Sequence, residues 1–448
     1  MKINCLLVGH NFVHEMQVIS QIFFSGAGFA VCDKIPSEGY TVLGQVENTT
    51  CTGELYLDGK KIASHSLNFE NKRSLMLALF YTLKEATGQP TPWGALTGVR
   101  PAKQVRIWLD EGDSEEEIFE RLSKVYMVRE DKINLALDVA KNDENDKDDF
   151  GIGLYIGVPF CPSRCLYCSF VVAQKAGPDA HERYLDALEK ECANIPKDNI
   201  NAVYIGGGTP TVFSEENFGK LLKITAPFVN NVEYTVEAGR PDSITLEKLR
   251  LMKEYGVNRI AINPQSLNDA TLKRIGRSHT VDDFVKSYEM AKLVGFDNIN
   301  TDIIVGLPGE TVADVQKTMK GLISLAPAHI TVHTLAVKRA SQLKDRQEDL
   351  ADYQVIDEML TIASEYCKQL GLNPYYMYRQ KNMLGHFENV GWALPGYESI
   401  YNVAMMAETQ TVLAAGAGAV SKTIEGDLIT RKFNPKNVEI YIERMMTQ

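Results

Sequence analysis

Apolar and polar positions follow a new pattern from about residue 151, where short apolar runs begin to alternate with amphipathic stretches. An apolar run bounded by turn residues predicts a buried strand, whereas apolar residues every three or four positions predict a helix. The predicted strands are GLYIGV, AVYIGGG, VEYTVEA, RIAIN, NINTDIIVGLP and HITVHTLAV, and the predicted helices between them are HERYLDALEKECANI, EENFGKLLKITAPFV, TLEKLRLMKEYG, VDDFVKSYEMAKLVG and ADVQKTMKGLISLA. This alternation predicts a parallel sheet, either open or closed into a barrel. Binding sites in both arrangements lie at the carboxyl ends of the strands.

The flanking segments lack this rhythm. Residues 1 to about 90 predict a small α+β unit with a hairpin at Asp58-Gly59 and a final helix that ends at Gly88. Residues 142–150, which are polar and acidic, predict a linker. We therefore expect three domains, namely an N-terminal α+β domain at 1–145, a β/α core at 146–340 and a C-terminal α+β cap domain at 341–448.

Composition narrows the classes of function. A formal net charge of -11 disfavours non-specific nucleic-acid binding, which needs clustered cations. No apolar run approaches the ~18 residues of a membrane helix, and the first residues lack a signal-peptide pattern. The expected compartment is therefore the cytoplasm, where thiols stay reduced and clustered cysteines indicate metal or catalytic ligands rather than disulfides.

Three cysteines, Cys161, Cys165 and Cys168, are crowded into GVPFCPSRCLYCSF, directly after the first strand of the core. Structural zinc takes four protein ligands, and no second cysteine pair follows here. An iron–sulfur cubane held by three thiolates keeps one iron open to a small molecule. The spacing favours an iron–sulfur cluster, with zinc and coincidence as the alternatives.

The segment YIGVPFCPSRCLYCSF resembles the signature of radical S-adenosylmethionine (SAM) enzymes. Its lead-in from Tyr155, together with GGGTPT and GLPGET, resembles the oxygen-independent coproporphyrinogen III oxidase family over residues 153–448. PYYMYRQKNM, ENVGWALPGYESIYN and the separate N-terminal domain resemble its HemZ-type branch. The resemblance implies a partial (β/α)6 barrel in which Cys161, Cys165 and Cys168 hold a [4Fe–4S] cluster.

The resemblance also implies the reaction. SAM chelates the open iron, and one-electron reduction cleaves it to methionine and a 5′-deoxyadenosyl radical. The radical takes a hydrogen from a propionate of coproporphyrinogen III, and loss of CO2 and an electron gives a vinyl group. Two rounds give protoporphyrinogen IX, an oxidoreductase step of haem biosynthesis.

Residues at successive strand ends match the positions at which this family binds SAM. The expected cofactor-binding residues are Tyr155, Gly207, Gly208, Thr209, Glu237, Gln265, Arg277, Asp302, Ile304 and Ala336. Any one of them alone is better explained as a structural residue, but their shared location at consecutive strand ends favours a site.

The expected partners are a tetrapyrrole substrate and a one-electron donor such as flavodoxin or ferredoxin. Three tyrosines beside Arg379 and Lys381 would complement a flat anionic tetrapyrrole, as would Lys338 and Arg339. An amphipathic strand with solvated charges explains the same pattern. We expect surface or capping roles for His279 and His386, which lie in polar loops.

Two positions depart from the family pattern. The coproporphyrinogen oxidase branch has a further cysteine where this chain has Phe170, and the haem-chaperone branch has a histidine where this chain has Tyr401. The first departure weakens the case for decarboxylation, and the second argues against the haem-chaperone branch. The alternatives to decarboxylation are haem delivery on the same scaffold, or another radical reaction on a tetrapyrrole, such as methyl transfer or haem ring opening.

Overall fold

The computed structural model describes residues 1–68, 71–142, 151–170, 173–174, 176–338, 340–345, 350–426 and 428–447. Within it the chain forms two compact units, Met1–Leu137 with Arg379–Phe387, and Asp138–Tyr378 with Glu388–Gln448. The expected linker lies outside the described residues from position 143 onward. The division into three domains remains a prediction.

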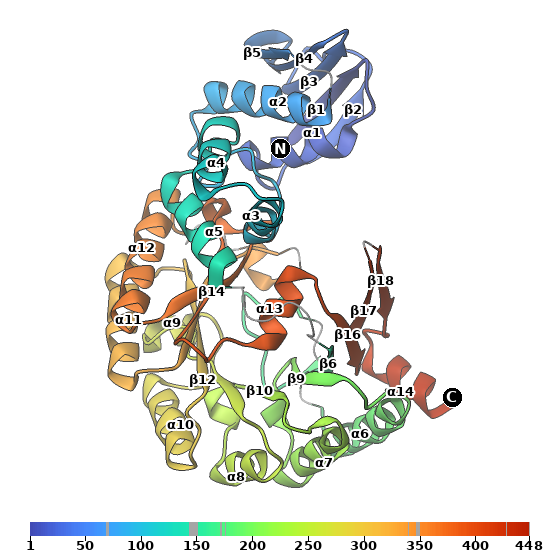
Figure 1. Ribbon diagram of the computed structural model, residues 1–448, viewed down its shortest axis with the longest axis vertical. Helices are drawn as coiled ribbons and strands as arrows, with labels where there is room; N and C mark the ends of the chain where they lie inside the picture. The colour runs from blue at the N-terminus through green and yellow to red at the C-terminus, as the bar shows by residue number, and fades with distance from the viewer. Residues whose placement is uncertain are drawn as a thin grey trace. The chain divides into compact units, whose positions relative to one another are not determined.

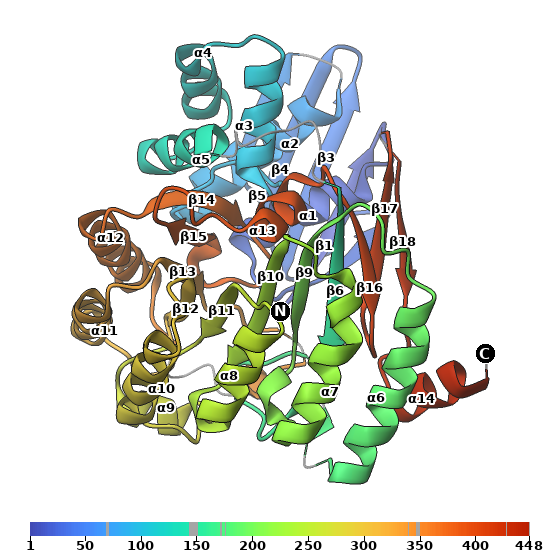
Figure 2. The same cartoon turned by 60° about the horizontal axis from the view of Figure 1, so that its bottom comes forward.

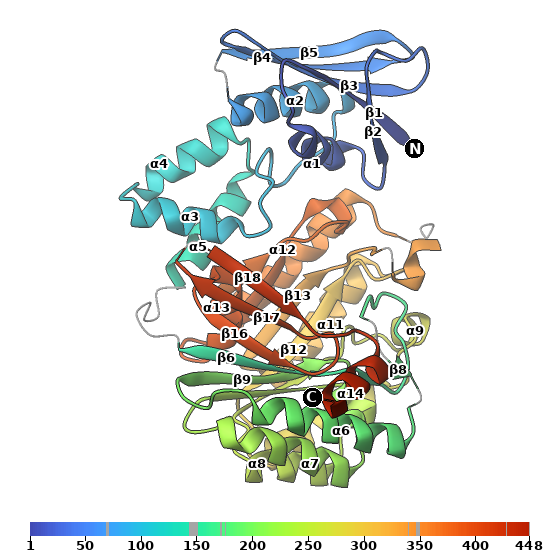
Figure 3. The same cartoon turned by 90° about the vertical axis from the view of Figure 1, so that its right-hand side faces the viewer.

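The first unit contains a five-stranded sheet in the order β2-β1-β3-β4-β5. Its elements are β1 (Lys2–Val8), α1 (Val13–Phe23), β2 (Gly28–Cys32), β3 (Tyr40–Glu47), β4 (Thr50–Leu57), β5 (Lys60–Asn68), α2 (Lys72–Thr87), α3 (Pro101–Asp110), α4 (Glu115–Glu120), η1 (Arg121–Val125), the start of α5 (Glu130–Asn142) and η7 (Leu384–His386). Helices α1 and α2 lie on the same face of the sheet (Figure 3).

Both turn predictions in this unit are confirmed. Asp58 and Gly59 connect β4 to β5 and both have positive φ, as a two-residue hairpin of this kind requires. Gly88 ends α2 in the left-handed conformation, where its N–H donates to the Lys84 carbonyl.

The second unit is built on an eleven-stranded sheet in the order β14-β15-β13-β12-β11-β10-β9-β6-β16-β17-β18. Its strands are β6 (Ile152–Val158), β9 (Ile200–Gly207), β10 (Glu233–Gly239), β11 (Arg259–Ile262), β12 (Ile299–Val305), β13 (His329–Thr334), β14 (Asn373–Tyr378), β15 (Asn389–Ala393), β16 (Thr411–Ala415), β17 (Val420–Glu425) and β18 (Leu428–Phe433). Its α-helices, besides the end of α5, are α6 (Pro178–Ala193), α7 (Glu215–Thr225), α8 (Leu246–Glu254), α9 (Asp269–Arg274), α10 (Val281–Leu293), α11 (Val312–Leu325), α12 (Tyr353–Gln369), α13 (Ile400–Ala407) and α14 (Val438–Thr447).

The short elements of this unit lie at the strand ends and in the connections. They are β7 (Phe160–Cys161), β8 (Ala173–Gln174), η2 (Pro210–Val212), η3 (Ala226–Phe228), η4 (Pro241–Ser243) and η5 (Gln342–Asp345). Strands β7 and β8 pair in parallel with each other as a separate two-stranded sheet.

The predicted parallel sheet is confirmed. The six predicted strands are β6 and β9 to β13, and each pairs in parallel with the next. Helices α6, α7, α8, α10 and α11 follow an arc outside these strands (Figure 1), and Figure 2 shows them against the outer face. Strand order follows chain order, so all six carboxyl ends meet at one edge.

Strands from the C-terminal part of the chain extend this sheet on both sides. Strand β16 pairs in parallel with β6, and β17 and β18 continue from it as an antiparallel hairpin. On the other side β15 pairs antiparallel with β13, and β14 with β15. The first strand of the core is therefore an interior strand of the larger sheet. No helix among the described residues is both long and apolar enough to span a membrane.

Candidate cofactor site

The three cysteines lie on the loop after β6. Cys161 belongs to the short strand β7, Cys165 is buried, and Cys161 and Cys168 are partly exposed. Burial raises the pKa of Cys161, and the neighbouring Cys168 and Cys165 thiolates raise it further. Three thiols that repel one another as thiolates suit a site where a cationic group neutralises them.

Backbone contacts hold this loop from two neighbouring segments. The Leu166 N–H donates to the Ile275 carbonyl at 2.9 Å, and the Leu166 carbonyl accepts from the Gln342 N–H at 3.0 Å. Arg164 Nη2 donates to the Ala340 carbonyl at 2.6 Å. The loop therefore has a defined path although little regular structure supports it.

The glycine segment after β9 packs directly against the cysteine segment. The N–H groups of Gly208 and Thr209 donate to the carbonyls of Val158 and Phe160 at 2.6 and 2.7 Å. A Cβ at Gly208 would lie 2.4 Å from the Phe160 carbonyl oxygen, so no larger residue fits without displacing that backbone. Thr209 Oγ1 lies 3.4 Å from Cys161 Sγ.

Tyr155 and Gly207 meet at the ends of β6 and β9. Gly207 has a φ of 104°, and a Cβ on it would lie 3.2 Å from the Tyr155 hydroxyl. The Tyr155 ring stacks on Tyr204, with 6.2 Å between ring centroids. These contacts place the Tyr155 hydroxyl beside the glycine segment.

Glu237, near the end of β10, is held by a tyrosine from the adjacent strand. The Tyr204 hydroxyl donates to Glu237 Oε1 at 2.5 Å. Burial raises the pKa of Glu237 to about 7, against the lowering effect of the Tyr204 hydrogen bond. The Tyr401 ring also stacks on Tyr204, with ring centroids 4.6 Å apart.

Gln265, Asp302 and Ile304 come together through their backbones. The Gln265 N–H donates to the Asp302 carbonyl and its carbonyl accepts from the Ile304 N–H, both at 3.0 Å. Gln265 has a φ of 66°, a strained conformation for a residue with a side chain. Its Oε1 is buried and has no hydrogen-bond partner in the described structure. Strain combined with an unsatisfied acceptor indicates a ligand site.

His333 is a residue of this site that the sequence did not suggest. Its Nε2 lies 3.6 Å from Asp302 Oδ2, and Asn300 Nδ2 donates to Asp302 Oδ1 at 2.7 Å. Burial raises the pKa of Asp302, but the hydrogen bond and charge of His333 outweigh it and hold the pKa below its usual range. The alternation of β13 was a usable signal, because it places His333 on the same face of the strand as His329 and Thr331.

Arg277 follows α9 and faces the cysteine loop. Its Nη2 donates to the Tyr167 hydroxyl at 2.8 Å, while Nε and Nη1 are buried and unpartnered among the described residues. Burial disfavours the charged guanidinium, yet nearby Tyr167 and Cys165 raise the pKa of Arg277 overall. A buried guanidinium with two free donors calls for an anion such as a carboxylate.

The expectation of a surface or capping role for His279 is wrong. Its side chain is buried behind Arg277, with Nδ1 at 3.9 Å from Asp242 Oδ1. Burial lowers the pKa of His279 to about 4, and the Arg277 charge contributes in the same direction. The surrounding loop is polar in sequence, but it folds inward over the ends of β10 and β11.

The expected substrate residues lie in different places. Lys338 is partly buried and close enough to Cys168 for their charges to interact, while Ala336 is buried just after β13. Arg379 donates from Nη1 to the Leu96 carbonyl at 2.6 Å, within the first unit, so its guanidinium has a structural partner. Lys381 is exposed in the same unit. Arg339 lies outside the described residues.

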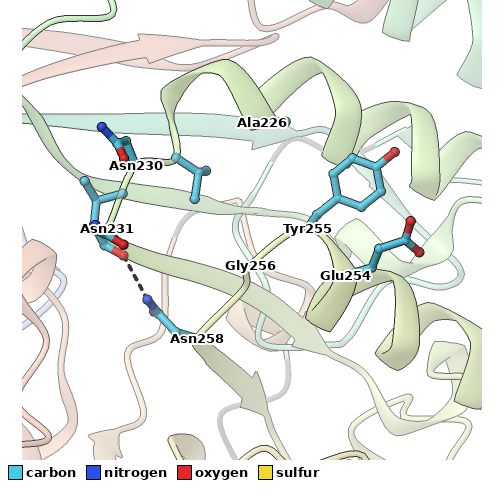
Figure 4. Close-up of a pocket in the computed structure, with 9 residues that line it drawn as sticks. Ala226, Asn230, Asn231, Glu254, Tyr255, Gly256 and Asn258 are labelled. Atoms are coloured by element: carbon cyan, nitrogen blue, oxygen red, sulfur yellow. Dashed lines mark hydrogen bonds between the residues drawn. The ribbon is translucent and has the colours of Figure 1, made fainter.

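A surface pocket occurs at the opposite ends of the strands. It has a volume of about 490 Å³ and is lined by residues that precede β10 and β11, among them Asn231, Tyr255 and Asn258 (Figure 4). Asn258 Nδ2 donates to the Val232 carbonyl at 2.8 Å, which ties the two connections together. The pocket is therefore separate from the cysteine loop.

The described residues fit an iron–sulfur cluster with an attached ligand better than a lone metal ion. No group of three His, Cys, Asp or Glu side chains within the described ranges could hold one ion. In a cubane each thiolate binds a different iron, so the thiols need not converge on one point. The unpartnered atoms of Gln265 and Arg277 supply an acceptor and two donors for a polar ligand beside the loop.

Known proteins resemble this chain in both sequence and fold. The model of the radical SAM superfamily matches residues 155–322. The Bacillus subtilis protein "oxygen-independent coproporphyrinogen-III oxidase-like protein HemZ" is 37% identical over 428 residues, which cover 91% of this chain and 85% of that protein. Heme chaperone HemW of the same organism is 32% identical over 281 residues, covering 59% of this chain and 69% of the relative.

Among solved structures, Escherichia coli coproporphyrinogen III oxidase HemN matches with a TM-score of 0.55 at 22% identity. The match covers 70% of this chain and 72% of that one. At this level of identity the similarity establishes a common fold.

Proposed function

Because the chain belongs to the oxygen-independent coproporphyrinogen III oxidase-like family of radical SAM proteins, we propose that it oxidatively decarboxylates coproporphyrinogen III to protoporphyrinogen IX. The cofactors of radical SAM proteins are a [4Fe–4S] cluster and SAM. The observation that supports this function best is the 37% identity to the HemZ protein, which extends over both units.

In this proposal Cys161, Cys165 and Cys168 hold the cluster. Their place supports it, because all three lie on one short loop after β6, and the Cys165 thiolate contributes to the raised pKa of both Cys161 and Cys168. The Thr209 hydroxyl at Cys161 Sγ adds a hydrogen bond of the kind that tunes a cluster.

The SAM contacts in this proposal are the residues expected from the sequence at the strand ends. The free donors of Arg277 suit the carboxylate of SAM, and the unpaired Gln265 Oε1 suits a donor group. Glu237 and Asp302 bring two acidic groups to the interior of the sheet, where a sulfonium and ribose hydroxyls would complement them. Gly207, Gly208 and Thr209 bring backbone close to the ligand.

The cluster and SAM supply radical chemistry by one-electron reductive cleavage of SAM. For each vinyl group, one propionate C–H bond and the bond to its carboxylate break, CO2 leaves, and one electron is released. One electron therefore enters and one leaves per decarboxylation, and we propose a flavodoxin or ferredoxin as the donor. The chain's own part is to hold the propionate near SAM and to exclude water.

Tyr378 on β14 is the proposed aromatic contact for a tetrapyrrole, because its side chain is partly exposed, whereas the neighbouring Tyr376 is buried. Their rings are stacked, with an interplanar angle of 7°, on β14. The charges of Asp302 and Glu237 act on the Tyr378 hydroxyl, which places Tyr378 in the same interior as the SAM residues. Phe170 is 59% exposed, so the position where the oxidase branch has a cysteine faces solvent in this chain.

Haem delivery is the second candidate, because the chain is also similar to the HemW chaperone. Tyr401 disfavours it. Its side chain, at the position of the chaperone histidine, is 7% exposed and packs against Tyr204. A residue buried in this way cannot reach a haem iron without repacking.

The test is anaerobic turnover. We expect the reconstituted full chain, given SAM, a low-potential reductant and coproporphyrinogen III, to form protoporphyrinogen IX with one methionine per vinyl group, measured by mass spectrometry. Replacing Cys165 by Ser should abolish the absorption near ~400 nm and the activity, whereas Cys32→Ser in the first unit should retain both. Methionine release without a vinyl product would contradict decarboxylation, and a methylated or ring-opened product would identify another radical reaction. Stoichiometric haem binding without turnover would favour delivery.

A further inference from the structure

Arg240 lies directly after β10, and its side chain reaches the middle of the cysteine loop. Its Nη1 donates to Ser163 Oγ at 2.8 Å and to the Ser163 carbonyl at 3.3 Å. Its Nε and Nη2 donate to Asp242 Oδ1 and Oδ2 at 2.9 and 2.7 Å. The planar fork of an arginine can make both sets of bonds at once, whereas a lysine cannot.

Ser163 stands midway between Cys161 and Cys165, so this contact fixes the part of the loop that the backbone bonds at Leu166 do not reach. The Arg240 side chain is 4% exposed, and such a buried charge persists only when it is paired and hydrogen-bonded. Asp242 supplies the pairing charge, with its side chain 22% exposed.

The charges of Arg240 and Asp242 also influence the cysteine loop electrostatically. The guanidinium bonds to Ser163, which is two positions from both Cys161 and Cys165, so its positive charge lies close to the cysteine loop. The reduction potential of an iron–sulfur cluster depends on the net charge around it and on hydrogen bonds to its ligands. A positive charge favours the reduced cluster, and a negative charge disfavours it.

We propose that Arg240 and Asp242 form a charge-balanced positioning pair that fixes the middle of the cysteine loop and sets the reduction potential of the cluster. Arg240, which contacts Ser163 directly, draws the potential upward, and Asp242, which contacts only the other two nitrogens of the guanidinium in this set of bonds, draws it downward by less. This inference rests on the proposed cluster at the three cysteines, and it does not depend on the identity of the substrate.

The experiment compares reconstituted full-length chains carrying Arg240→Met, Asp242→Asn, both changes together, or Arg240→Lys. Arg250→Met is the matched control, because Arg250 lies on the outside of α8 with 63% of its side chain exposed. Iron bound per chain and the midpoint potential, followed by electron paramagnetic resonance, are measured on each without substrate.

We expect Arg240→Met to lower the midpoint potential, Asp242→Asn to raise it, and the double variant to lie between them. Both variants that carry Arg240→Met should bind less iron, since Ser163 loses both bonds from Arg240 and keeps the weaker 3.4 Å bond from its hydroxyl to the Gly276 carbonyl. Arg240→Lys should keep the potential near that of the wild type but bind less iron, and Arg250→Met should match the wild type in both measurements.

Equal potentials and equal iron content across the Arg240 and Asp242 variants would overturn the inference, and so would shifts of the same sign in the two single variants. If Arg240→Met does not fold, Asp242→Asn and Arg240→Lys decide the question by the same two measurements. A wild-type chain that takes up no cluster would overturn the proposed function together with this inference. A cluster that binds normally and has the same potential in all variants would overturn the inference alone.

Discussion

The Tyr204 hydroxyl on β9 donates a 2.5 Å hydrogen bond to Glu237 on the adjacent strand β10. Glu237 lies near the carboxyl end of its strand, the end at which the cysteine loop follows β6. The Tyr204 ring stacks on Tyr401 and lies beside Tyr155, so its hydroxyl has little freedom to turn away. The carboxyl group is therefore fixed in direction before any ligand binds.

Glu237 should make the stability of the ligand-free protein depend on pH. Its pKa is raised to about 7 from 4.5, so between these values the folded state binds more protons than the unfolded state. The stability that this group contributes is present at pH 4.5 and is lost as the pH rises through 7. The free energy of unfolding should fall by at most about 3 kcal/mol over this range. Urea unfolding at several pH values should show that Glu237→Gln removes this decline. If the free energy of unfolding depends on pH in the same way in the wild type and in Glu237→Gln, this prediction is wrong.

Gly208→Ala should disturb the cysteine loop, because its Cβ would lie 2.4 Å from a backbone oxygen. We expect severalfold less iron per chain after reconstitution, measured by colorimetric iron assay. Gly219→Ala is the control, since a Cβ there meets only Leu251 Cδ1 at 3.9 Å within 4 Å. Gly219 lies inside α7, so this change should leave iron binding intact and stabilise the fold by up to about 1 kcal/mol. Full iron loading of Gly208→Ala would exclude the close packing described for this segment.

Arg277→Met should separate ligand binding from folding. Two buried nitrogens of Arg277 have no partner in the described structure, so removing the charge should cost the ligand-free protein little beyond the 2.8 Å hydrogen bond to the Tyr167 hydroxyl. A lost charged hydrogen bond to a carboxylate weakens binding by about 1.5–3 kcal/mol, and we expect the SAM dissociation constant to rise roughly ten- to hundredfold by calorimetry. Unchanged affinity would remove Arg277 from the SAM site.

His333→Ala should affect the substrate more than SAM. The His333 side chain is 26% exposed and its Nε2 lies 3.6 Å from Asp302 Oδ2, so the exposed part of the ring is available to a carboxylate of the substrate. We expect turnover to fall about tenfold or more while SAM affinity stays within about twofold. His14→Ala, at an exposed position in the first unit, serves as the control. An equal loss of SAM affinity would place His333 at SAM instead.

The core of the fold was predictable because its signals are local. Each strand of the parallel sheet is a short apolar run, and Asp58-Gly59 and Gly88 satisfy conformations that few other residues adopt. Site residues such as Gln265 and Arg277 could be predicted only from the resemblance of motifs. The structure adds that Gln265 Oε1 and two nitrogens of Arg277 have no hydrogen-bond partner among the described residues.

Other features depend on pairings between distant residues. Arg240 and Ser163 are 77 positions apart, and nothing in either local sequence indicates the other. His279 reads as a loop residue because its neighbours are polar, and its burial follows from the loop folding back over the sheet. The pairing of β16 with β6 joins segments about 260 residues apart, beyond the reach of any periodicity.

The pairing of β16 with β6 has a consequence for folding during translation. Strand β6, which leads into the cysteines, has a bare edge until residues 411–415 have been synthesised and have added beside it. The growing chain must therefore carry its thiols beside an incomplete sheet while roughly 240 further residues are synthesised. We therefore expect the cluster to be inserted after translation, when β16 has paired with the edge of β6.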